Sequence, residues 1–152
     1  MNTEVLLIGV GNDYRSDDAA GLFVARRVQE RRWRLITVCE SNGEGAALID
    51  AWKEYGTVIL ADAVCSGSKA GTIHRIEAHN ETLPAKLFQY STHAFSVAEA
   101  VELARVLNRL PARLIVYGIE GKSFASGIGL SLEVDEAVKI VVDCVLKDLP
   151  PD

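Results

Sequence analysis

The feature of this sequence that most constrains its fold is the alternation of short apolar runs with longer segments of helical period. Residues 4–10 (EVLLIGV) form an apolar run that ends at glycines, which is typical of a buried strand, and residues 18–31 then place apolar side chains mostly at helical spacing. The same alternation continues to the end of the sequence. It predicts further strands at 34–39, 57–61, 72–77 and 113–119, and further helices at 46–55, 94–107 and 134–146.

Strands that alternate with helices predict an α/β fold, a three-layer sandwich in which helices cover both faces of a mainly parallel, twisted five-stranded sheet. The run at 72–77 follows the strand at 57–61 too closely for a parallel return, which needs a crossover of about a dozen or more residues. We therefore expect 72–77 to be an antiparallel edge strand. In such folds ligands bind at the carboxyl ends of the strands, so the residues that follow the strands are the candidates for chemistry.

Length and composition indicate one domain, spanning residues 1–152, because a chain of 152 residues with 49% hydrophobic content can bury one sizeable core. A net charge of -5 argues against a nucleic-acid partner, since phosphate binding needs clustered Lys and Arg. No run approaches the roughly 20 apolar residues of a membrane span. Cys39, Cys65 and Cys144 are odd in number and lie in apolar segments, which suits buried thiols in a reducing compartment. We expect a cytoplasmic protein without a membrane partner.

The first predicted strand runs into a glycine turn, GVGN at 9–12, and two successive acids, Asp17 and Asp18, follow at a helix start. A dinucleotide-binding turn needs a third glycine where Tyr14 stands, and adjacent carboxylates would repel phosphate. Glu40, at the end of the second strand, does resemble an acid that holds a ribose, so dinucleotide binding stays open as a minor alternative. Two successive acids cannot both cap one helix, and we expect Asp18 to face the crevice.

Two further polar residues are predicted at the same edge of the sheet. Asp62 directly follows the buried strand at 57–61, a depth at which most residues are apolar, so a ligand-binding role is favoured over a role in the following turn. His93 precedes the apolar face of the next helix. With Ser91 or Thr92 as the helix cap, its imidazole would lie on the same rim as the two acids.

Two carboxylates and one imidazole that converge would neutralise a divalent cation and leave coordination positions open. This ligand set suits nickel, zinc or cadmium better than magnesium, so we expect Asp18, Asp62 and His93 to share one metal ion. A protonated imidazole cannot bind a cation, and aspartates titrate at lower pH, so we expect His93 to make recognition of the metal depend on pH. His74 and His79 are interpreted as structural.

The glycine turn at 9–12, the paired acids followed by Gly21, the Ala-Asp62-Ala segment and the isolated Ser-x-His93 together resemble the nickel-iron hydrogenase maturation proteases. The order and intervals of these motifs match across nearly the whole chain. The resemblance implies an endopeptidase that removes the C-terminal extension of a nickel-loaded hydrogenase large-subunit precursor. It also implies that Asp18, Asp62 and His93 form the catalytic site and contact nickel that the substrate supplies, with zinc or cadmium as possible substitutes.

Two departures from the family pattern concern the site. Ala19 stands where family members commonly have glycine, and residues 40–43 read ESNG where the family commonly has Asp-Gly-Gly-Thr. The second departure alters a segment expected to meet the substrate and leaves open which hydrogenase is the client. A module that senses nickel or binds the precursor without cutting it is the main alternative, because it would use the same metal-binding residues. The sequence shows neither the Ser-His-Asp order of a serine protease nor the HExxH motif of a zinc protease, so these peptidase classes receive no support.

Overall fold

The structure is a computed structural model that describes residues 4–88 and 95–150 of the chain. Its centre is a five-stranded sheet with the strand order β2-β1-β3-β5-β4. The strands are β1 (Val5–Val10), β2 (Ile36–Ser41), β3 (Thr57–Val64), β4 (Ile73–Glu77) and β5 (Arg113–Glu120). Only β4 pairs antiparallel, against β5 at the sheet edge, and the other described pairings are parallel. The predicted α/β sandwich and its antiparallel edge strand are both confirmed.

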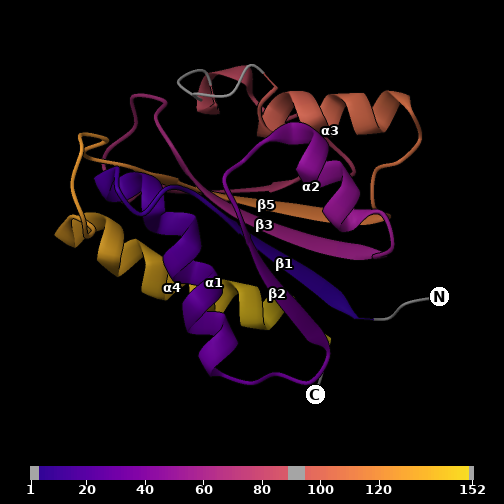
Figure 1. The fold of residues 1–152 in the computed structure, drawn as a ribbon, viewed down its shortest axis with the longest axis horizontal. Coiled ribbons are helices and arrows are strands. Elements are labelled where there is room, and N and C mark those ends of the chain that lie inside the picture. The colour runs from indigo at the N-terminus through magenta and orange to yellow at the C-terminus, as the bar shows by residue number, and fades with distance from the viewer. Residues whose placement is uncertain (1–3, 89–94, 151–152) are drawn as a thin grey trace.

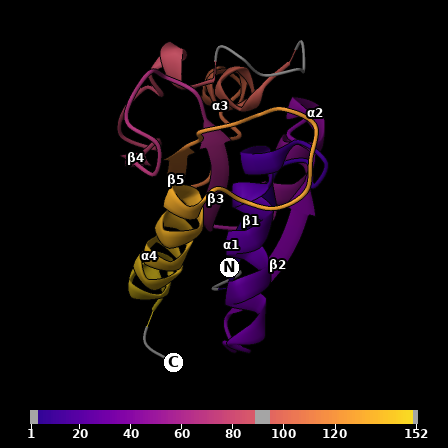
Figure 2. The same cartoon turned by 90° about the vertical axis from the view of Figure 1, so that its left-hand side faces the viewer.

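Helices cover both faces of this sheet. Figures 1 and 2 show α1 and α4 packed together on one face, with α2 and α3 on the other. The helices in the described ranges are α1 (Ala20–Glu30), α2 (Gly45–Trp52), α3 (Val97–Val106) and α4 (Leu132–Asp148), with short 3-10 turns η1 (Ser16–Ala19) and η2 (Ala85–Leu87). The helix predicted from residue 18 therefore divides into η1 and α1.

The core consists of two apolar layers, one on each side of the sheet. Alternate side chains of β1 point to opposite faces: Leu6 and Ile8 pack with α2 and α3, whereas Val5 and Leu7 pack with α1 and α4. Because both faces are covered, every residue of β1 is buried, which explains its continuous apolar run. Across the described part of the chain, no helix is both long and apolar enough to cross a membrane.

Helix α3 begins later than the sequence predicts. Its N-cap is Ser96, whose backbone N–H lies 3.4 Å from a carboxylate oxygen of Glu99 and whose hydroxyl donates to the same oxygen at 2.9 Å. The caps predicted at Ser91 or Thr92 are therefore wrong. Both residues, together with His93, lie in the segment 89–94 outside the described residues, so His93 precedes the helix cap in sequence.

Helix α1 packs on the sheet through a close backbone approach at Gly21. A Cβ atom there would lie 2.2 Å from the carbonyl oxygen of Ala61 in β3 and 2.4 Å from that of Val10 in β1. No other side chain fits at this position unless the helix moves away from the sheet. The contact therefore sets η1 and the start of α1 against the carboxyl ends of β1 and β3.

We expect Gly21→Ala to lower the free energy of unfolding by roughly 1–3 kcal/mol or more, because the added methyl group forces α1 off the two strands. Urea denaturation of both proteins measures the difference. Gln29→Ala, at the exposed end of the same helix, is the control and should change stability by less than about 0.5 kcal/mol. Equal stability of Gly21→Ala and the unaltered protein would contradict the close packing described here.

Candidate active site

A pocket of about 300 Å³ opens at the carboxyl ends of β1 and β3. Its polar lining comes from the turn after β1, the loop after β2 and the end of β3, and its apolar wall comes from η2, the start of α3 and the loop after β5. The polar set comprises Arg15, Asp18, Asn42, Asp62 and Cys65, and the apolar set includes Val64, Leu87, Phe88, Val97 and Phe124. The pocket lies where α/β folds bind ligands.

Asp18 and Asp62 both line this pocket, as predicted. Asp62 is only 8% exposed, and its burial raises the pKa of its carboxyl well above the ordinary value; the nearby charge of Asp18 adds to the rise, while a backbone hydrogen bond at Ala63 opposes it. Two carboxylates that interact electrostatically favour a proton or a cation in their vicinity. The raised pKa of Asp62 therefore counts against the expectation that its carboxyl titrates as an ordinary aspartate.

Asp62 lies inside β3 and not after its end, which corrects the predicted strand boundary at residue 61. The pairing of β3 with β5 continues from Asp62, opposite Gly118, to Val64, opposite Glu120. Asp62 therefore projects from a strand that is hydrogen-bonded on past it. Its backbone is held more firmly than that of a loop residue.

Asp17, the other acid of the pair, has a different task. It is fully buried, and its carboxylate accepts hydrogen bonds from the backbone N–H groups of Lys122 (2.8 Å), Ser123 (3.0 Å) and Ser131 (2.7 Å) and from the Ser131 hydroxyl (2.9 Å). Burial alone would raise the pKa of Asp17, but these donors outweigh it and lower the pKa below its usual value. Asp17 thus remains charged and fastens the loop at 121–131 beside the pocket.

Asp18 faces the pocket, as the sequence analysis expects, but neither acid is the cap of a helix. The N-caps of η1 and α1 are Arg15 and Ala19, and neither makes a side-chain capping bond. Asp17 binds donors more than 100 residues away in the sequence, which local capping rules do not anticipate. Asp18 consequently faces the pocket from a turn held on its other side.

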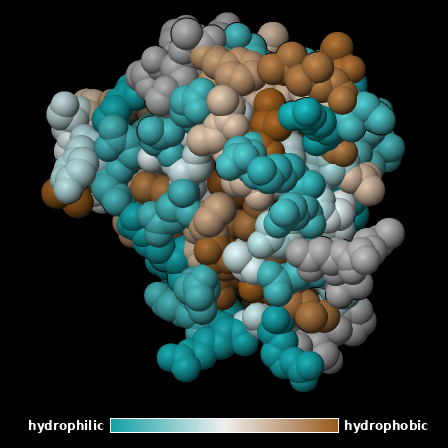
Figure 3. Space-filling model, turned by 45° about the vertical axis from the view of Figure 1, so that its right-hand side comes forward, coloured by the Kyte–Doolittle hydropathy of each residue, from teal (hydrophilic) through white to brown (hydrophobic). Residues whose placement is uncertain are grey.

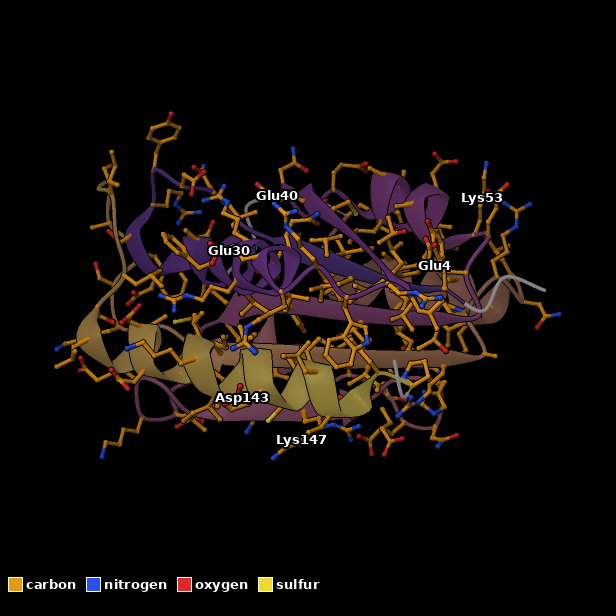
Figure 4. All side chains as sticks on the ribbon, turned by 90° about the horizontal axis from the view of Figure 1, so that it is seen from below. Glu4, Glu30, Glu40, Lys53, Asp143 and Lys147 are labelled. Carbon is orange, nitrogen blue, oxygen red and sulfur yellow. The ribbon has the colours of Figure 1, made fainter. Side chains whose placement is uncertain are left out.

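Glu40, the acid that favoured a dinucleotide, is engaged in an ion pair. Arg26 of α1 donates from Nε and Nη2 to its two carboxylate oxygens at 3.0 and 2.9 Å and also bonds both oxygens of Asp13 at 2.9 and 2.8 Å. Figure 4 labels Glu40 on its strand near α1. Both oxygens that would hold a ribose are thus occupied by a guanidinium, so this feature no longer favours the dinucleotide interpretation.

Glu120 is a buried acid that the sequence interpretation did not select as a site residue. It is 1% exposed and accepts hydrogen bonds from the backbone N–H of Ser66 (2.7 Å) and its hydroxyl (2.6 Å), with Nε2 of His74 at 3.3 Å. It therefore holds the loop that carries Cys65 into the pocket. The rule that selected Asp62, an acid at the carboxyl end of a central strand, would also have found Glu120.

The two histidines interpreted as structural and the three cysteines agree with the sequence analysis, except in the exposure of the cysteines. His74 pairs with Glu120, and His79 accepts a 3.0 Å hydrogen bond at Nδ1 from the Leu114 backbone N–H, so both make structural contacts. The cysteines are free, as predicted. However, Cys39, Cys65 and Cys144 are all partly exposed and not fully buried.

His93 lies outside the described residues, so its place in the site stays a prediction. Within residues 4–88 and 95–150, no group of three or more His, Cys, Asp or Glu side chains could hold a metal ion. The described part of the site is therefore a two-carboxylate arrangement. The predicted third ligand belongs to a segment that continues from Phe88, a residue of the pocket wall.

Comparison with known proteins assigns the chain to a family. The model of the HycI family, described as hydrogenase maturation protease, matches residues 24–148. The chain belongs to this family. Its enzyme class is accordingly that of a peptidase. The sequence resemblance drawn from the glycine turn, the paired acids and Asp62 is thereby confirmed.

Individual relatives agree with this assignment over nearly the full length of both partners. The Hydrogenase 2 maturation protease of Escherichia coli is 27% identical over 151 residues, covering 95% of this chain and 90% of that protein. The structure of the maturation protease HybD from Thermococcus kodakarensis superposes with a TM-score of 0.74 at 24% identity, covering 97% and 99% of the two chains. An Escherichia coli endopeptidase solved in solution reaches a TM-score of 0.80 at 23% identity, with 95% and 90% coverage.

The two neighbouring acids should respond oppositely to replacement. The folded state binds the proton of Asp62 more tightly than the unfolded chain does. The ionised carboxyl therefore destabilises the fold as the pH rises above the pKa that Asp62 has in the unfolded chain. We expect Asp62→Asn to raise Tm at neutral pH by about 2–4 °C. This gain should disappear below about pH 4, where the aspartate is protonated in both states.

Asp17→Asn is the matched comparison. Its lowered pKa means that the charged form stabilises the fold above about pH 4, and this stabilisation is lost as pH falls through the folded-state pKa. We expect this variant to lower Tm at neutral pH, because it weakens four hydrogen bonds to a buried charge. Thermal melts between pH 3 and pH 8 measure both effects, and shifts of the same sign at neutral pH would refute the division of roles.

Proposed function

We propose that this chain removes the C-terminal extension from a nickel-loaded hydrogenase large-subunit precursor. The observation that carries the proposal is the pair of carboxylates, Asp18 and Asp62, in the pocket of a member of this protease family. The buried position of Asp62 and the charge of Asp18 make ionisation of Asp62 unfavourable. A cation that enters beside the pair relieves this cost, so the pair is well suited to meeting a metal that arrives with the substrate.

In the proposed reaction the nickel belongs to the precursor. Asp18 and Asp62 offer oxygen ligands, and His93 offers a nitrogen ligand from the segment that follows Phe88. Two carboxylates and an imidazole balance a divalent charge and leave coordination positions for groups of the precursor. The protease thereby distinguishes a loaded precursor from an unloaded one, and zinc or cadmium would substitute for nickel in binding.

The pocket wall suits an extended peptide held beside these carboxylates. Leu87, Phe88 and Val97 form an apolar surface that excludes water from the bound segment. Asn42 and Gly43 line the pocket as well, and they belong to the ESNG segment in which the chain departs from the family pattern. We therefore assign selection of the hydrogenase client to this segment.

The cytoplasm is the proposed location of the reaction. The cysteines at 39, 65 and 144 are free and partly exposed. Thiols in this state persist in a reducing compartment.

Cleavage of the precursor is the direct test. Nickel-loaded precursor incubated with the protein should lose its C-terminal extension, and mass spectrometry of the product detects the loss. We expect Asp18→Asn, Asp62→Asn and His93→Ala each to abolish processing, and His93→Ala to leave Tm nearly unchanged. A non-cleaving, nickel-sensing or precursor-binding module would leave the precursor intact, and that result with the unaltered protein would overturn the proposal.

Metal binding should depend on pH through two groups. As pH falls from 7 to 5, protons compete with the metal at His93, because a free histidine has a pKa of about 6.5, and the raised pKa of Asp62 makes its carboxyl compete for protons at higher pH than an ordinary aspartate does. Calorimetric titration with nickel or cadmium should therefore show weaker binding at mildly acidic pH. His93→Ala should bind more weakly at neutral pH and keep a residual pH dependence from Asp62. Equal affinity of the variant and the unaltered protein at neutral pH would remove His93 from the site.

A further inference from the structure

Two large apolar side chains are exposed beside the mouth of the pocket. Tyr14, in the turn after β1, is 71% exposed, and Ile128, in the loop between β5 and α4, is 83% exposed. Isolated exposed apolar residues are ordinary on protein surfaces. These two differ because the backbone of Tyr14 is hydrogen-bonded to that of Gly127, the residue before Ile128, and we call this pair the Tyr14–Ile128 edge.

The backbone contacts that form this edge are numerous. The N–H of Gly127 donates to the carbonyl of Tyr14 at 2.9 Å, and the N–H of Ser16 donates to the carbonyl of Gly127 at 3.0 Å. The Ser16 hydroxyl donates to the carbonyl of Ala125 at 2.8 Å. Asp17 then anchors both ends of the same loop through Lys122 and Ser131. The loop is thus held in place from several sides while Ile128 stays in contact with solvent.

The loop geometry itself turns Ile128 outward. Gly127 and Gly129 flank it with φ values of 155° and 98°, in the region that favours glycine over other residues. A Cβ atom on Gly129 would meet no neighbouring atom within 4 Å, so the chain there stands clear of the rest of the molecule. A preformed apolar surface of this kind binds a partner at a lower entropic cost than one that must first become ordered.

The edge is continuous with the pocket because the same two segments build both. Arg15, next to Tyr14, and Phe124, in the loop of Ile128, line the pocket. Arg15 and Gly127 form a parallel bridge between the segments. A protein whose tail enters the pocket on this side would therefore lie next to the edge.

We propose that the Tyr14–Ile128 edge is a docking surface for the folded body of the hydrogenase large-subunit precursor, next to the point where its extension leaves that body. The inference rests on the proposed function and adds a second contact between the protease and the precursor, besides the tail in the pocket. The edge takes an apolar surface of the precursor, whereas the carboxylate pair takes the metal and the pocket takes the tail. Recognition by the edge lowers KM for the folded precursor without changing the chemical step.

The test is a double variant, Tyr14→Ser with Ile128→Ser. Biolayer interferometry measures Kd for the nickel-loaded precursor, and processing assays measure KM and kcat. We expect Kd and KM to rise about tenfold, which is the effect of losing contacts somewhat weaker than an interface hot spot, with kcat and Tm unchanged. The matched control is Val106→Ser on α3, 82% exposed. Figure 3 shows that apolar atoms also gather along the upper part of the molecule, so exposed apolar surface is not confined to one place. The control variant should leave Kd and KM unchanged.

The possible outcomes separate this inference from the proposed function. A tenfold rise in Kd that occurs in the double variant and not in the control supports the edge. If the unaltered protein binds the precursor without cutting it, that result overturns only the protease reaction and leaves the edge supported. Unchanged Kd and KM in a double variant that still processes the precursor would overturn the edge and leave the proposed function standing. An unaltered protein that forms dimers in gel filtration, with a monomeric double variant whose precursor Kd is unchanged, would assign the edge to self-association and also overturn the inference.

Discussion

The close approach of α1 to the sheet at Gly21 is the constraint on which the site depends. Only a residue without a side chain lets the helix backbone lie against the carbonyl groups of β1 and β3 at once. That contact brings the turn carrying Asp17 and Asp18 to the carboxyl-end half of β3, where Asp62 lies. The carboxylate pair is therefore a product of helix packing and not of any local motif taken alone.

The two acids at 17 and 18 show how environment separates chemically identical neighbours. Asp17 is surrounded by N–H and hydroxyl donors that favour its charge, whereas Asp18 shares a pocket with a second carboxylate whose charge is disfavoured. Asp17 stabilises the fold, whereas the charge of Asp18 disfavours the ionised form of Asp62. Groups in a binding pocket commonly lower the stability of the fold in this way where a ligand supplies the missing charge.

Much of this could be predicted from the sequence, because the period of apolar residues reports which faces are buried. The strand at 72–77, the covering helices and the placement of Asp18 and Asp62 on one rim all follow from periodicity and chain order. The start of α3 differs from the prediction because Ser96 is followed three residues later by Glu99 and forms a capping box with it, a local signal that Ser91 and Thr92 lack and that the apolar period alone does not report. The role of Asp17 could not be predicted because its hydrogen-bond donors are distant in the sequence, and local rules do not see them. Glu120, at the end of β5, could have been selected by the same rule that selected Asp62, although its partner Ser66 could not.

The hydrogen bonds of Asp17 have a consequence for biosynthesis. Its carboxylate and its donor Ser131 are 114 positions apart in the sequence, so the turn that presents Asp18 is held only when most of the chain has been made. During translation the N-terminal β1 and α1 emerge early, while the loop that fastens them emerges near the end. A nascent chain still short of residue 131 consequently has its acids but not their fixed arrangement. The protein thus gains an assembled pocket late in its own synthesis, after β5 has closed the centre of the sheet.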